Sequence, residues 1–215
     1  MTNYIPDIPL EELVRIKKDI EGTKLKNGRS TSDTEFSWLY RLSQPLEILE
    51  RIATSPESSA LQIIGVGAES PDYTNTDALA HIHNHPSGLV IPTNGDISYF
   101  LRSIQRNQDL RYELIASTSE GVVSGFYVME YTGDRESISK KLTQLDKCFQ
   151  GHAKKRKKEM EDFPDSFLHI GVGDSIFTQE EYAKISLELM ELAGVKHYAV
   201  AIPSYKFQDW QFIKE

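Results

Sequence analysis

Hydrophobic residues recur every three or four positions in several stretches of the chain, which is the spacing of one face of an α-helix. The pattern over 10–20 ends at Gly22, where a helix stop is expected, and a similar pattern over 45–53 begins with a proline that can open a helix. A third stretch, 96–104, starts with an acidic residue that suits the positive end of a helix dipole. The sequence therefore predicts helices at these three places.

Apolar runs of strand length, bounded by turn residues, alternate with these helices. Residues 60–68 and 77–83 flank a Ser-Pro-Asp turn cluster and predict a hairpin, and 112–116 and 122–129 predict two more strands. Residues 34–42 fit either a strand or one face of a helix, so both interpretations stay open there.

A second pattern follows the last of these strands. Residues 136–162 are strongly charged and helical in their spacing, and 167–173 form an apolar run of strand length. A capping box that begins at Thr178 then opens a helix, Gly194 stops it, and 195–202 has the pattern of a strand. This order predicts a β-α-β unit near the end of the chain.

The size and composition fit one globular domain with appendages. The chain has 215 residues, of which 39% are hydrophobic and 26% charged. We expect an α/β domain over 1–135 with its core at about 45–132, a charged helical connector over 136–165, and a C-terminal β-α-β extension over 166–215.

The N-terminus and the cysteine count bear on the compartment. No apolar run approaches the ~20 residues that a bilayer-spanning helix needs, and no basic segment followed by an apolar stretch opens the chain. The single cysteine, Cys148, cannot form an internal disulfide and excludes a cysteine-based zinc site. We therefore expect a cytoplasmic protein with no membrane partner, in which histidine and carboxylate side chains would hold any metal.

The charge of the chain disfavours nucleic acid as a partner. A formal net charge of −8 repels a polyanion except where basic residues cluster. One such cluster, Lys154 to Lys158, is followed at once by Glu159, Glu161 and Asp162. This neighbourhood favours an exposed charged helix or linker over a phosphate-binding groove.

The clearest chemical motif is the run HIHNHPSG at residues 81–88. On a strand, His83 and His85 project from the same face and can converge on one ion, and Asp96 lies beyond a turn at the start of a helix. Catalytic zinc sites use three protein ligands and keep one position for water, so these three residues are the expected zinc ligands. We expect His81 to pack beside the site, since a fourth protein ligand would expel the water.

The motif resembles that of the JAMM (MPN+) metalloproteases, the JAB-domain superfamily, whose pattern is His-x-His-Pro-x6-Ser-x-x-Asp. The sequence HNHPSG is most similar to the motif of the RadC-type bacterial branch of this superfamily. The resemblance covers about 14 residues directly and implies a JAMM-like fold, a mixed, largely antiparallel sheet flanked by helices. It also implies that His83, His85 and Asp96 bind zinc and that Thr93, which stands in place of the family's serine, helps to bind the oxyanion.

The resemblance further implies an enzyme, a zinc-dependent hydrolase that cleaves an amide or isopeptide bond in a protein or peptide substrate. One candidate is the C-terminal linkage of a ubiquitin-like modifier. The family uses a glutamate beside the His-x-His strand as general base. We favour Glu57, because it follows a helix and a proline and the predicted hairpin would set it opposite His83 to His85. Glu35 is the alternative, since its separation from His83 along the chain is closer to that of the family.

A second interpretation stays open. The RadC-like motif could mark a non-catalytic binding module, associated with DNA metabolism, that retains the metal site. The basic run Lys154 to Lys158 is its only support in the sequence. Nothing in the sequence indicates the oligomeric state or what the residues after 136 contact.

Overall fold

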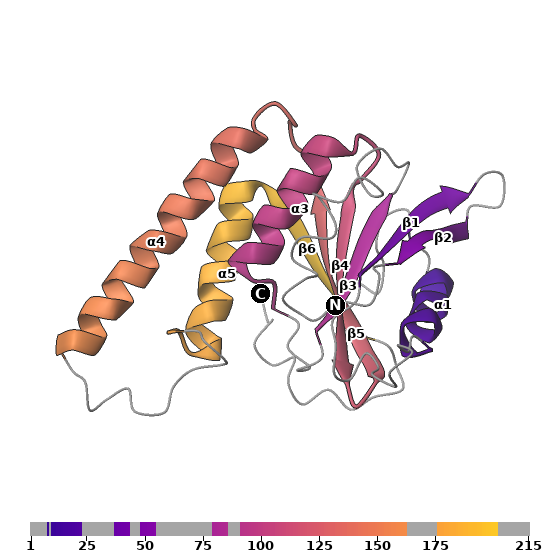
Figure 1. Ribbon diagram of the computed structural model, residues 1–215, viewed down its shortest axis with the longest axis horizontal. Helices are drawn as coiled ribbons and strands as arrows, with labels where there is room; N and C mark the ends of the chain where they lie inside the picture. The colour runs from indigo at the N-terminus through magenta and orange to yellow at the C-terminus, as the bar shows by residue number, and fades with distance from the viewer. Residues whose placement is uncertain are drawn as a thin grey trace.

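The structure is a computed structural model that describes residues 8, 10–22, 37–43, 48–54, 79–85, 91–162 and 176–201. A six-stranded mixed sheet stands at its centre (Figure 1). The strands are β1 (Ser37–Ser43), β2 (Ile48–Thr54), β3 (Ala80–His85), β4 (Tyr112–Ser119), β5 (Val122–Tyr131) and β6 (Val195–Ala201). They lie in the order β2-β1-β3-β4-β5-β6, and of the described pairs only β3 and β4 run parallel. The expected α/β class, with a mixed and largely antiparallel sheet, is confirmed.

Helices cover both faces of this sheet (Figure 1). They are α1 (Leu10–Glu21), α3 (Asn94–Arg106), α4 (Ile138–Asp162) and α5 (Gln179–Ala193). Alternation along β5 shows the two layers: Phe126 and Val128 pack in the core under α1, whereas Tyr127 and Met129 pack in the core that α3, α4 and α5 share. The candidate metal motif therefore lies in a strand with a hydrophobic layer on each side.

Most elements expected from the hydrophobic spacing are confirmed. These are the helices over 10–20, 96–104 and 136–162, the helix after Thr178, the strand that enters the histidine motif, and the strands over 112–116, 122–129 and 195–202. The described part of the ambiguous stretch 34–42 belongs to strand β1. The strands expected over 60–68 and 167–173 lie outside the described residues, and the domain boundaries stay a prediction.

The helix expected over 45–53 is wrong, because Ile48–Thr54 forms strand β2. It pairs antiparallel with β1, with Leu42 opposite Leu49 and Trp38 opposite Thr54. A short apolar run fits a helix and a strand equally well, and backbone pairing with a neighbouring strand outweighs weak local propensity. The β-branched side chains of this segment also suit a strand.

Strand β3 has a neighbour on each side. It pairs with β1 along one edge, where Ser37 lies opposite His83, and with β4 along the other. A strand forms ladders only along its two edges, and both are occupied over Ala80–His83, so the expected hairpin with 60–68 is wrong over those four residues. Glu57 lies outside the described residues, so its expected place opposite the histidine motif stays a prediction.

None of the helices that the structure describes is long and apolar enough to cross a membrane.

Candidate metal centre

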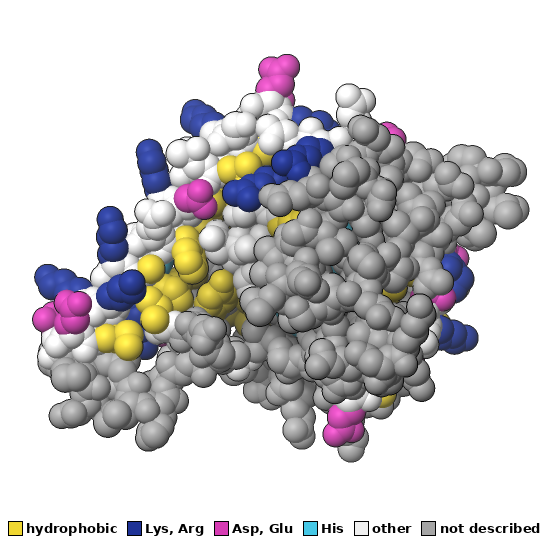
Figure 2. Space-filling model, in the orientation of Figure 1, with side chains coloured by type: hydrophobic (Ala, Val, Ile, Leu, Met, Phe, Trp, Pro, Cys, Tyr) yellow, Lys and Arg dark blue, Asp and Glu magenta, His cyan; other side chains and the backbone are white. Residues whose placement is uncertain are grey.

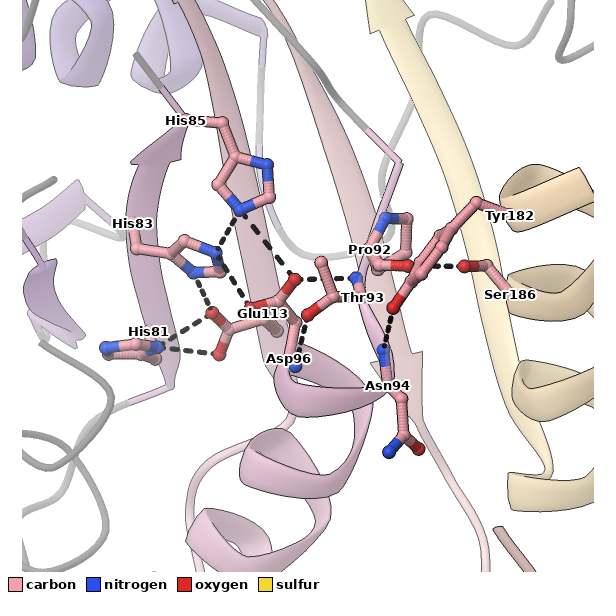
Figure 3. Close-up of polar contacts among 10 residues, drawn as sticks. All are labelled: His81, His83, His85, Pro92, Thr93, Asn94, Asp96, Glu113, Tyr182 and Ser186. Carbon is pink, nitrogen blue, oxygen red and sulfur yellow. Dashed lines mark hydrogen bonds and ion pairs between the residues drawn. The ribbon is translucent and has the colours of Figure 1, made fainter. Parts of the chain in front are cut away.

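Side chains alternate along β3, so the residues of the histidine motif face two opposite sides of the sheet. Ala80 and Ile82 belong to the core cluster under α1. Successive side chains of a strand point to opposite faces, so His81, His83 and His85 face the α3 side of the sheet. All three are buried. The strand thus presents three imidazoles in a row to the beginning of α3 (Figure 3).

A capping box holds the carboxylate of Asp96 at the start of α3. Thr93 is the N-cap residue, and its Oγ1 accepts a hydrogen bond of 3.1 Å from the backbone N–H of Asp96. In return the backbone N–H of Thr93 donates to Oδ2 of Asp96 at 2.6 Å. Two of the helix's otherwise unpaired N–H groups are satisfied in this way, and the carboxylate is fixed toward β3.

Three donor groups meet between β3 and α3. Nε2 of His83 lies 3.0 Å from Nε2 of His85 and 3.5 Å from Oδ1 of Asp96. Nε2 of His85 lies 3.7 Å from Oδ2 of Asp96. Donors placed ~2.0 to 2.1 Å from a tetrahedral zinc ion are about 3.3 to 3.4 Å apart. The separations scatter around that value, so these residues fit a zinc-sized cation without rearrangement of the backbone.

Charge and exposure agree with a cation between these groups. Burial acts to raise the pKa of Asp96, but the neighbouring His83 and His85 and the hydrogen bonds from Thr93 outweigh it and lower the pKa. Asp96 is therefore an anion at neutral pH. Its side chain is 19% exposed, whereas those of the two histidines are 8% and 9% exposed. Solvent thus reaches the cluster from the Asp96 side.

Glu113 on β4 orients the histidines from behind. Its carboxylate is fully buried and lies 2.6 Å from Nδ1 of His83 and 2.7 Å from Nδ1 of His81 (Figure 3). Burial acts to raise the pKa of Glu113, but interactions with His81 and His83 outweigh it and lower the pKa. The ionised carboxylate can only accept, so each Nδ1 donates to it. In neutral His83 this leaves the Nε2 lone pair facing His85 and Asp96, as a metal ligand requires.

A second ligand-type group shares one imidazole with the first. His81, His83 and Glu113 also bring donor atoms within 4.8 Å of one another. Here the carboxylate bridges both Nδ1 atoms by hydrogen bonds, which accounts for the close approach without an ion. His81 is packed at this position against the ring of Tyr99, 5.4 Å away between ring centroids.

Helix α5 supports the turn that leads into α3. The hydroxyl of Tyr182 accepts a hydrogen bond of 3.1 Å from the backbone N–H of Asn94, and Oγ of Ser186 donates to the carbonyl of Pro92 at 2.5 Å. Both contacts are visible in Figure 3. Because Pro92 and Asn94 flank Thr93, these bonds anchor the backbone that carries the capping box.

Of the site residues expected from the sequence, His83, His85 and Asp96 come together within 4.8 Å. Thr93 stands next to them as the N-cap of α3, and its hydroxyl can still donate while it accepts from the helix. Glu57 and Glu35 lie outside the described residues. The structure is therefore compatible with the expected ligands and leaves the general base a prediction.

Sequence reasoning missed Glu113, Tyr182 and Ser186. A signal for Glu113 was present, because a charged residue within the apolar strand Tyr112-Glu113-Leu114-Ile115-Ala116 must be paired if it is buried. No comparable signal marks Tyr182 or Ser186, whose contacts depend on how α5 docks. Neither a protein-family model nor a curated protein sequence matches this chain.

Proposed function

We propose that this chain is a zinc-dependent hydrolase of the JAMM type that cleaves an amide or isopeptide bond in a protein substrate. The observation that carries the proposal is the convergence of His83, His85 and Asp96 at separations that suit tetrahedral coordination. Three protein ligands leave one position for water or substrate. The resemblance of the motif to JAMM metalloproteases suggests the reaction, and a ubiquitin-like modifier linkage is the candidate substrate.

Each residue of the site has a separate task in this proposal. A zinc ion bound there would supply Lewis-acid activation of a water molecule and of the substrate carbonyl. His83 and His85 offer neutral nitrogen donors, and Asp96 adds a negative charge that offsets part of the cation's. Glu113 keeps the proton of His83 on Nδ1. Thr93 is the candidate hydroxyl donor to the developing oxyanion.

The pairing of the strands bears on the identity of the general base. Glu35 is two residues from Ser37, and Ser37 lies opposite His83. Chain length alone keeps the Cα atoms of Glu35 and Ser37 within about 7 Å of each other. Glu57 is three residues from Thr54 on β2, which lies one strand further from β3, or about 4.8 Å more. Ser37 and Thr54, the described residues nearest to Glu35 and Glu57 along the chain, lie toward the end of the sheet where β3 finishes. The observed strand order therefore favours Glu35 over Glu57 as the base, the reverse of the preference drawn from the sequence.

The test is hydrolysis with matched glutamine variants. The zinc-loaded protein is incubated with isopeptide-linked ubiquitin-like conjugates and with a proteome-derived peptide library. Mass spectrometry counts the released modifiers with free C-termini from the conjugates and the new N-termini from the peptides. We expect cleavage that a chelator abolishes and zinc restores. Glu35→Gln should lose turnover while retaining zinc, and Glu57→Gln should keep both. Zinc-loaded protein that cleaves neither substrate set would contradict the proposal and favour a binding module.

The alternative of a DNA-associated module depends on the basic run of α4. Arg156 in that run is turned inward, where it donates to the carbonyl of Ile176 and pairs with Glu181 at 3.0 Å. The exposed members are Lys154, Lys155, Lys157 and Lys158. Figure 2 shows basic side chains spaced along the outer edge of this helix rather than gathered in a groove. Salt-dependent binding of duplex DNA that disappears when the four lysines are changed to Ala would support the alternative.

A further inference from the structure

A separate group of ligand-type side chains lies between α4 and α5. Cys148 and His152 are one helical turn apart on α4, and Glu188 faces them from α5. Sγ of Cys148 lies 3.3 Å from Oε1 of Glu188, and Nε2 of His152 lies 2.8 Å from Oε2 of the same carboxylate. All three donor atoms lie within 4.8 Å of one another. This group shares no residue with the buried centre.

The helix pair beneath these residues is well packed. Positions four apart on a helix share one face, which aligns Cys148 with His152. Next to them, Phe149 packs edge-on against Phe177 and Tyr182, and Leu145 and Leu189 are buried in the same core. The backbone positions of the three donors are thus fixed by a hydrophobic contact that does not involve them. A cation would bind without having to bring the helices together.

The three donors offer sulfur, nitrogen and oxygen to one point, a set that suits a borderline transition metal such as Zn²⁺. His152 is 34% and Glu188 50% exposed, so an ion can enter from solvent and keep water as a further ligand. Without an ion, burial and the neighbouring Glu188 raise the pKa of the Cys148 thiol to about 11, so the thiol is neutral and donates to the carboxylate. A bound cation would take the place of that proton, which leaves to solvent.

We propose that Cys148, His152 and Glu188 form a second metal site, which binds Zn²⁺ through one thiolate, one imidazole and one carboxylate and links α4 to α5. The single cysteine excludes a site built on several thiolates, but a mixed site needs only one. The proposal does not depend on the hydrolase activity of the buried centre.

Cobalt binding distinguishes the two sites. Cys148 is the only cysteine in the chain, so a thiolate-to-cobalt charge-transfer band in the near ultraviolet can arise from this site alone. The chain, kept reduced with a phosphine, is titrated with Co²⁺ and then with Zn²⁺. We expect the band in the wild type and in His83→Ala, its loss in Cys148→Ser, and its bleaching by zinc. The wild type should bind one more equivalent of cobalt than Cys148→Ser.

The variants of the other two ligands test the composition of the site. His152→Ala and Glu188→Gln, checked for folding by circular dichroism, should each weaken the cobalt affinity read from this band by at least about tenfold. Absence of the band from reduced wild type at saturating Co²⁺ would overturn the proposal. A band that persists with unchanged affinity in both variants would also overturn it, since the thiolate would then bind cobalt without the other two side chains.

Discussion

At the scale of single residues, Glu113 contacts the candidate metal centre without being one of its expected ligands. It is fully buried on β4 and accepts from both His81 and His83. A carboxylate behind a ligating imidazole fixes the ring's orientation and tautomer and increases its basicity. The geometry of the ligands therefore depends on a residue from a different strand.

Replacement of this carboxylate should weaken metal binding. In Glu113→Gln the amide keeps the volume but is a poorer acceptor for the two Nδ1–H groups, so we expect zinc affinity to fall by about 10- to 100-fold. Competition with a chromophoric chelator measures the change. Glu130→Gln is the matched control, because Glu130 is a buried carboxylate on the neighbouring strand that binds Arg111 and Tyr198. Equal losses in both variants would show a general destabilisation instead of an orienting role.

The residue scale also shows what the sequence could predict about the site. His83, His85 and Asp96 were found because strand alternation and helix starts are local patterns, and their spacing alone restricts the chemistry. Glu113 was accessible in principle, as a charge within an apolar strand. The partners of Glu113 could not be predicted, because the parallel pairing that sets His81 opposite Glu113 joins segments about 30 residues apart.

At the scale of elements, the capping box of α3 connects helix stability with metal geometry. Thr93 and Asp96 satisfy each other's backbone N–H groups, and Asp96 is at the same time an expected ligand. The chain contains a second capping box of the same form, in which Thr178 and Glu181 open α5 and neither residue is an expected metal ligand. The two boxes provide a comparison within one molecule.

Loss of each cap should have the same effect on stability and different effects on metal binding. Thr93→Ala and Thr178→Ala should each lower the free energy of unfolding by about 1 kcal/mol, the usual contribution of an N-cap hydroxyl. Only Thr93→Ala should also weaken zinc binding, because the backbone that holds Asp96 loosens. Chemical denaturation and chelator competition measure the two effects. Thr93→Ala with wild-type zinc affinity would contradict a role for the cap in positioning Asp96.

The elements also show where local patterns fail. The helices over 96–104 and after Thr178 were predictable because caps and hydrophobic spacing agree there. The stretch 45–53 was predicted as a helix although Ile48–Thr54 forms a strand, and the hairpin partner of Ala80–His83 was predicted wrongly. Both depend on β1, which lies between β2 and β3 in the sheet. A pairing between distant segments cannot be deduced from the period of either segment.

At the scale of the whole molecule, the C-terminal elements take part in the architecture of the candidate centre. Strand β6 extends the sheet beside β5, and α5 shares a hydrophobic core with α3. From α5, Tyr182 and Ser186 bind the backbone of Pro92 and Asn94. The residues after 175 therefore support the turn that carries Asp96.

Removal of one of these contacts should weaken zinc binding, although the changed residue is not a ligand. Tyr182→Phe removes the acceptor of the half-buried backbone N–H of Asn94, and loss of one such hydrogen bond costs about 0.5 to 1.5 kcal/mol. We expect lower stability together with a few-fold loss of zinc affinity. Tyr198→Phe removes a tyrosine hydroxyl that binds Glu130 on the same sheet and should leave zinc affinity unchanged. Calorimetric titration of both variants with zinc makes the comparison, and unchanged affinity in Tyr182→Phe would refute the coupling.

The most direct test of the buried centre is its metal content. Mass spectrometry of the native protein, carried out in a Cys148→Ser background so that only the buried centre is counted, should find about one zinc per chain. The same background carrying His83→Ala or Asp96→Ala should hold little zinc while remaining folded. A folded Cys148→Ser protein that takes up no zinc when supplied with it, or that binds zinc equally well without His83 and Asp96, would contradict the account.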